Sequence, residues 1–148
     1  MSKQFALATL LVLSMTLAGC GKSAGNIDGN WTTTLTTPPG GTPVFAFQTN
    51  FTGSGGGNFT ITSLTFTTAG TCFATGPFTE TGSVSLSGDY NGHVTGSFAM
   101  TISTQFPAGT NNVLSLNGAV ANSTITGTWT LTGGTGCSGN GVFTATRA

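Results

Sequence analysis

Very few side chains in this sequence could take part in acid–base, nucleophilic or metal chemistry. Of its 148 residues, three are Asp or Glu, three are Lys or Arg, three are Cys and one is His. An Asp–His pair can activate a serine for acyl transfer, and Asp89 and His93 are close in sequence. They flank Asn91-Gly92, however, a dipeptide typical of tight β-turns. We therefore interpret both side chains as polar turn residues, far from any pocket.

Paired carboxylates offer no better candidate for catalysis. A glycosidase needs two acids about 5–9.5 Å apart, but Glu80 and Asp89 stand at opposite ends of one expected strand, and Asp28 lies in the segment that enters the domain. The chain also lacks the basic patch that nucleic-acid binding requires. The sequence therefore predicts a protein that is not an enzyme, has no catalytic residues, metal or cofactor, and does not bind nucleic acid.

Cys72 and Cys137 are the two cysteines whose chemistry we expect to shape the fold. They occur in the glycine-rich segments GTCFATG and GTGCSGNG. A metal site would need further ligands beyond two thiols, and His93 is the only histidine. In an oxidising compartment such a pair forms a disulfide. We therefore expect a Cys72–Cys137 disulfide, provided that the chain is exported.

The N-terminus predicts export. Lys3 precedes an apolar run from Phe5 to Leu17, which is too short to cross a ~30 Å hydrocarbon core comfortably and is followed by small residues, as in a secretory signal. The segment LAGC, ending at Cys20, resembles the lipobox of bacterial lipoproteins. This resemblance implies cleavage before Cys20 and attachment of lipid to it; the alternative is an ordinary signal peptide with a chance cysteine.

The same resemblance implies a location and a partner. A protein with several acyl chains on Cys20 is held stably at a membrane. Gly21 follows this cysteine where an aspartate would favour retention in the inner membrane. We therefore expect a lipid-anchored protein of the bacterial cell envelope, at the outer membrane, on its periplasmic or surface face. The membrane is then its first partner.

The rest of the chain predicts a single all-β domain. We expect a signal peptide over residues 1–19, a lipid-anchored linker over 20–28 and a β-domain over 29–148. Apolar and polar residues alternate with period two between Gly, Pro and Asn breaks, which is typical of strands. Eight strands are expected, at 30–37, 43–52, 58–67, 78–88, 92–103, 112–120, 123–132 and 140–147. In the third strand the apolar residues change from odd to even positions between Ile61 and Leu64, which predicts a bulge near Ser63.

The connections between these strands favour an antiparallel up-and-down barrel. Short links alternate with longer ones that contain proline or cysteine, and in such a barrel alternate links emerge at opposite ends. Cys72 falls in the third link and Cys137 in the seventh, so both should lie at the same end. A β-sandwich built from the same meander is the alternative.

Two features at the ends of the domain resemble the calycins, the family of lipocalin and avidin-like barrels. The first strand opens with Gly29-Asn30-Trp31, and the last ends with Arg147. In calycins a Gly-x-Trp stands on the first strand and an arginine near the end of the barrel packs across that tryptophan. The resemblance implies a structural Trp31–Arg147 pair and a barrel architecture, but no particular ligand.

Three functional hypotheses remain open at the level of the sequence. The first is a barrel that binds a small apolar or amphiphilic ligand at its long-loop end, with unknown binding residues. The second is a structural or adhesive envelope protein with a packed core, whose polar faces contact envelope polysaccharide or other proteins. A third hypothesis inverts the barrel, with apolar side chains facing lipid. An eight-stranded barrel is just wide enough either to be filled by side chains or to hold one small ligand.

Overall fold

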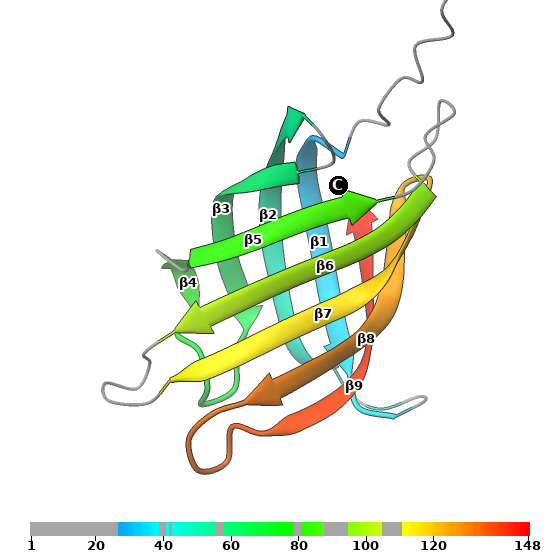
Figure 1. The fold of residues 1–148 in the computed structure, drawn as a ribbon. Helices are drawn as coiled ribbons and strands as arrows, with labels where there is room; N and C mark the ends of the chain where they lie inside the picture. The colour runs from blue at the N-terminus through cyan, green and yellow to red at the C-terminus, as the bar shows by residue number, and fades with distance from the viewer. Residues whose placement is uncertain are drawn as a thin grey trace, which may run out of the picture.

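The computed structural model describes residues 27–38, 41, 43–55, 58–78, 81–87, 95–104 and 111–148. These residues form nine β-strands and no helix (Figure 1). The strands are β1 (Gly29–Thr36), β2 (Pro43–Gly55), β3 (Asn58–Thr68), β4 (Gly76–Phe78), β5 (Thr81–Ser87), β6 (Thr95–Thr104), β7 (Asn112–Ala121), β8 (Thr124–Thr132) and β9 (Gly139–Arg147). The expected signal peptide, Cys20, Glu80, Asp89 and His93 lie outside the described residues.

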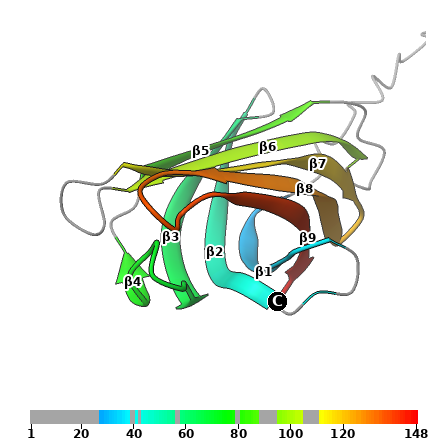
Figure 2. The same ribbon diagram turned by 90° about the horizontal axis from the view of Figure 1, so that it is seen from below.

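All nine strands belong to one antiparallel sheet that is strongly curled (Figures 1 and 2). Its order is β2-β1-β9-β8-β7-β6-β5-β3-β4, and β2 also pairs with β3. Strands that are neighbours in sequence are therefore mostly neighbours in the sheet. The expectation of an all-β chain built from antiparallel strands is confirmed.

The described residues form nine strands where the sequence predicted eight. The stretch predicted at 78–88 contains β5 and overlaps β4 only at Phe78, so β4 was not predicted as a strand; both β4 and β5 pair with β3. Leu64 of β3 pairs with Phe78 of β4, and Phe59 of β3 pairs with Val84 of β5. Five steps along β3 thus match six along β4–β5. Both pairings are antiparallel, and their registers along β3 differ by one residue.

The predicted bulge in β3 is confirmed. Asn50 of β2 pairs with Ser63, and the next residue, Phe51, pairs with Ile61, so that Thr62 has no opposite residue on β2. The Thr62 hydroxyl instead donates to Asn50, to its backbone oxygen at 3.2 Å or to its Oδ1 at 2.6 Å. The inserted residue moves the apolar side chains of β3 from odd to even positions, so that both halves of the strand face the core.

The concave side of the sheet holds a core rich in aromatic rings. One group lies toward the Cys72–Cys137 end, with ring centroids 4.5–5.8 Å apart, and consists of Phe45, Phe47, Phe66, Phe73 and Trp129. A second group lies toward the other end, with centroids 6.1–6.4 Å apart, and consists of Trp31, Phe51, Phe98 and Phe143. All nine of these side chains are at least nine-tenths buried. Their edge-to-face and offset contacts add to the stabilisation from burial alone.

Trp129 shows why the strands need glycine at particular positions. Its indole Nε1 donates to the backbone oxygen of Thr36, 2.9 Å away on β1, although β9 lies between β8 and β1. The indole crosses β9 at Gly141, where an added Cβ would lie 2.7 Å from Nε1 and 2.0 Å from the Thr36 oxygen. Only a residue without a side chain allows this contact to form.

Thr49 gives a first testable prediction. Its side chain is buried on the inner face of β2, and its hydroxyl has no hydrogen-bond partner among the described residues. A buried polar group without a partner costs about 1–3 kcal/mol. We therefore expect the isosteric change Thr49→Val to raise the free energy of unfolding by about 1 kcal/mol, measured by chemical denaturation. Thr126→Val, on the exposed face of β8, should change it by less than about 0.5 kcal/mol. If Thr49→Val were less stable than the parent protein, the Thr49 hydroxyl would not be a buried group without a hydrogen-bond partner.

Candidate functional site

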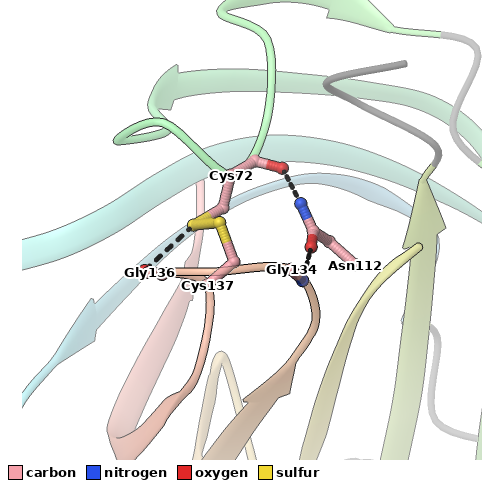
Figure 3. The surroundings of a disulfide bond; sticks show 5 residues. All are labelled: Cys72, Asn112, Gly134, Gly136 and Cys137. Carbon is pink, nitrogen blue, oxygen red and sulfur yellow. Dashed lines mark hydrogen bonds between the residues drawn. A yellow bond between two sulfur atoms is a disulfide. The ribbon is translucent and has the colours of Figure 1, made fainter. Parts of the chain in front are cut away.

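The first candidate region is the end of the sheet where the two cysteines meet. Cys72 lies in the connection between β3 and β4, and Cys137 in the connection between β8 and β9. They form a disulfide with a Cα–Cα distance of 5.5 Å, and both residues are buried (Figure 3). The predicted disulfide is confirmed, and so is the placement of both loops at one end.

A buried asparagine ties the same two loops together. Asn112, the first residue of β7, is fully buried and lies between them (Figure 3). Its Nδ2 donates to the backbone oxygen of Cys72 at 2.8 Å, and its Oδ1 accepts from the backbone NH of Gly134 at 3.0 Å. The side chain packs directly on Gly133, where a Cβ would lie 1.9 Å from Oδ1. One amide thus satisfies backbone groups of both loops.

Sequence reasoning missed Asn112, although one signal was present. Asn112 shares its parity with the core residues Leu114 and Leu116, so the alternation of β7 places it on the inner face. An amide on an apolar face must find hydrogen-bond partners within the protein. Its position should therefore have indicated a structural contact, but the partners could not be named from the strand alone.

Phe73 fills the space beneath these loops. It follows Cys72 in the chain and is almost completely buried. Its ring stacks on Phe66, with a centroid distance of 4.5 Å and an interplanar angle of 10°, and meets Phe45 edge-on at 5.6 Å. The sequence predicted a ligand pocket at this end as one of the open hypotheses. In the structure, a side chain of the protein occupies the position under the loops.

The opposite end carries the Trp31–Arg147 pair expected from the calycin resemblance. Trp31 of β1 and Arg147 of β9 are register partners, and the guanidinium carbon lies 5.2 Å from the centre of the indole ring. The indole Nε1 donates to the backbone oxygen of Ile27 at 2.8 Å. Trp31 and Ile27 are fully buried. The tryptophan thus ties the segment before β1 to the core and lies under a cation at the rim.

This pair gives a second prediction. A guanidinium over an indole face contributes about 0.5–1 kcal/mol at an exposed site, and Arg147 is exposed. Arg147→Gln should therefore lower the free energy of unfolding by about 1 kcal/mol in chemical denaturation and should alter the Trp fluorescence of the folded protein. Arg147→Lys keeps the charge but loses the flat group, so its effect should be intermediate. Equal stabilities for all three proteins would show that the contact contributes nothing.

The second candidate region is a groove on the outside of the sheet, over β1, β2 and β3. Its volume is about 260 Å³. The lining residues are Asn30, Trp31, Thr32, Gln48, Thr49, Ser63, Thr65 and Ala148. Trp31 and Thr49 are buried residues of β1 and β2, so that they alternate with outward-facing neighbours. The groove is therefore lined by amide and hydroxyl side chains around two inward-pointing residues.

A chain of hydrogen bonds runs along one side of this groove. The Thr62 hydroxyl donates to Asn50 Oδ1 at 2.6 Å, and Asn50 Nδ2 donates to Asn30 Oδ1 at 2.8 Å. The chain crosses from β3 through β2 to β1. It fixes the orientation of the Asn30 amide with its oxygen toward Asn50. Among the described residues, no hydrogen bond uses the Asn30 Nδ2 group.

Other chemistry is not evident in the described part of the chain. No three His, Cys, Asp or Glu side chains gather there in a way that could hold a metal ion. Within the same residues, no helix is long and apolar enough to span a bilayer. Within the described residues, the groove and the disulfide end are the two regions considered as candidates.

Comparison with known proteins adds no relative on which an assignment could be based. No protein-family model matches the chain, and no significant match was found among curated proteins or among solved structures.

Proposed function

We propose that this protein is a non-enzymatic lipoprotein of the bacterial cell envelope, anchored through lipid on Cys20, and that it acts through the outer surface of a barrel with a filled interior. The packing of the described core side chains is the observation that carries the proposal. Nine aromatic side chains pack along the core, and Phe73 lies beneath the two loops that the disulfide joins. The proposal thus follows the hypothesis of a structural or adhesive envelope protein rather than the hypothesis of a barrel that binds a small ligand inside.

The strand pairings support a closed up-and-down barrel of the calycin kind. β2 pairs with both β1 and β3, and β3 pairs with β5 through Asn58↔Ser85 and Phe59↔Val84. The pairings from β2 through β1, β9, β8, β7, β6, β5 and β3 therefore lead back to β2 and form a ring. Together β4 and β5 occupy one strand position beside β3. On this interpretation eight strand positions surround the core, which is a size that side chains can fill.

The anchor gives the barrel an orientation. Ile27 lies seven positions after Cys20, and an extended chain spans at most about 3.6 Å per residue. The end that carries Ile27 and the Trp31–Arg147 pair would therefore lie within about 25 Å of the membrane surface. The disulfide end would face away from it, and the outer face of the barrel would be open to other envelope components.

Lipid attachment has a direct test in the intact chain. The protein produced in a bacterium that processes lipoproteins is expected to take up labelled palmitate, and Cys20→Ala is expected to remain unlabelled and unprocessed. Equal labelling of both proteins would place the lipid elsewhere. Absence of label from both would remove the anchor from the proposal.

The filled interior is tested with indole as an aromatic probe. Isothermal titration into the purified protein, with a detergent blank, is expected to show no saturable binding. Phe73→Ala should open a space beside Phe45 and Phe66 and should bind indole at one site, provided that its circular dichroism spectrum is unchanged. Saturable binding of indole to the unchanged protein would overturn the filled interior and favour the ligand-binding hypothesis.

A further inference from the structure

We propose that the groove over β1, β2 and β3 is a binding site for an uncharged saccharide chain. The proposal deepens the proposed function, on which it rests, by naming the class of partner that the outer surface contacts. The groove is concave and lined by polar side chains, and the chain as a whole has few charged residues.

The geometry of the groove follows from strand register. Thr32 of β1 pairs with Gln48 of β2, which pairs with Thr65 of β3, so these three outward side chains form one row across the sheet. A second row is formed in the same way by Asn30, Asn50 and Ser63. Successive outward residues of a strand are about 6.6–6.8 Å apart. The two rows are therefore separated by roughly the width of a sugar ring.

The chemistry of the lining favours a neutral partner rich in hydroxyl groups. The residues of the two rows offer amide and hydroxyl groups only, and none of the residues that line the groove carries a charged side chain. An anionic ligand would find no cation there, and an apolar ligand would leave these polar groups without partners, which is unfavourable. Saccharide hydroxyls both donate and accept hydrogen bonds, as the lining side chains do. A volume of about 260 Å³ is adequate for one or two sugar units of a longer chain.

The amide side chains beside this groove are preorganised by hydrogen bonds within the protein. The hydrogen bonds from Thr62 to Asn50 and from Asn50 to Asn30 hold two amides in fixed orientations before any ligand arrives. Asn30 thereby keeps its Nδ2 group as a donor for a ligand, and Gln48 stands in the middle of the facing row. Side chains that are already ordered lose less conformational entropy on binding.

The experiment uses defined oligosaccharides and the whole anchored protein in detergent. Cellohexaose, maltohexaose and chitohexaose serve as uncharged probes, and hexagalacturonate serves as the charged probe. Isothermal titration is expected to show saturable binding of at least one uncharged hexasaccharide, with a dissociation constant between about 0.1 and 1 mM. Hexagalacturonate is expected to bind at least tenfold more weakly.

Two variants locate the site. Gln48→Ala removes an exposed amide from the centre of the groove and should weaken the binding of the neutral hexasaccharide at least tenfold. Asn117→Ala removes an exposed amide from the outer face of β7, away from the groove, and should leave the affinity unchanged. Both variants should melt at the temperature of the parent protein, because neither side chain is buried.

The possible failures are distinguishable. If none of the three neutral hexasaccharides binds, or if Gln48→Ala and Asn117→Ala weaken binding equally, the saccharide site is wrong. Stronger binding of hexagalacturonate would also overturn it and would indicate a charged partner at another surface. None of these results affects the filled interior, which fails only if indole binds to the unchanged protein.

Discussion

Replacing Cys72 and Cys137 together by alanine is expected to lower the free energy of unfolding by about 4 kcal/mol. The two residues are 65 positions apart in sequence, so the disulfide closes a long loop and restricts the unfolded chain strongly. In the folded protein the bond also joins the loop after β3 to the loop after β8, which the backbone hydrogen bonds of the sheet do not connect. The loss should therefore be large although the sheet itself remains complete.

Chemical denaturation of the parent protein and of the double alanine variant measures this difference. The parent protein in reducing agent is the matched control, because it loses the bond while keeping both side chains. Once its disulfide is fully reduced, it should lose about as much stability as the double variant. A loss below about 1 kcal/mol in both would contradict the loop-closure argument.

Replacement of Asn112 by alanine is expected to cost about 3 kcal/mol. The fully buried amide donates to the Cys72 oxygen and accepts from the Gly134 NH. Its removal leaves two buried backbone groups without partners, and each such group costs about 1–3 kcal/mol. Relaxation of the loops and entry of water reduce the total cost of the two unpaired groups. We therefore expect each group to cost an amount in the lower half of that range, which gives the total of about 3 kcal/mol.

Thermal and chemical denaturation of Asn112→Ala provide the measurement, and Asn117→Ala is the control on the same strand. Asn117 is exposed, so its replacement should change stability by less than about 0.5 kcal/mol. The disulfide and Asn112 hold the same pair of loops, and we therefore expect their effects to be coupled rather than additive. Equal losses from the two asparagine variants would show that the buried amide has no special role.

These two predictions concern the end of the barrel that, in our proposal, faces away from the membrane. The disulfide and the amide join two loops at this end through a covalent bond and hydrogen bonds, and the ring of Phe73 packs in the core beneath them. Phe73 already lies beneath these two loops, where a small ligand would have to bind. This is the reason why the outer groove, rather than the interior, is the better candidate for recognition.

The sequence by itself determined where most strands lie and which of their residues point toward the core. Alternation of apolar and polar residues is a local property, and it placed most strand ends within about two residues of those observed. It also located the bulge near Ser63, because a change of parity within a strand has few other causes. The order of short and long links placed Cys72 and Cys137 at one end. The Trp31–Arg147 pair came from a family resemblance rather than from periodicity.

Tertiary structure alone decided the features that depend on residues far apart in the chain. The partners of Asn112, 40 and 22 residues away, leave no trace in local periodicity. The ring of Phe73 could have faced solvent from its loop, and only the packing against Phe45 and Phe66 places it in the core. The groove exists because the register of three strands aligns Thr32, Gln48 and Thr65. Alternation fixes which face a side chain takes, but long-range contacts decide which neighbours it meets there.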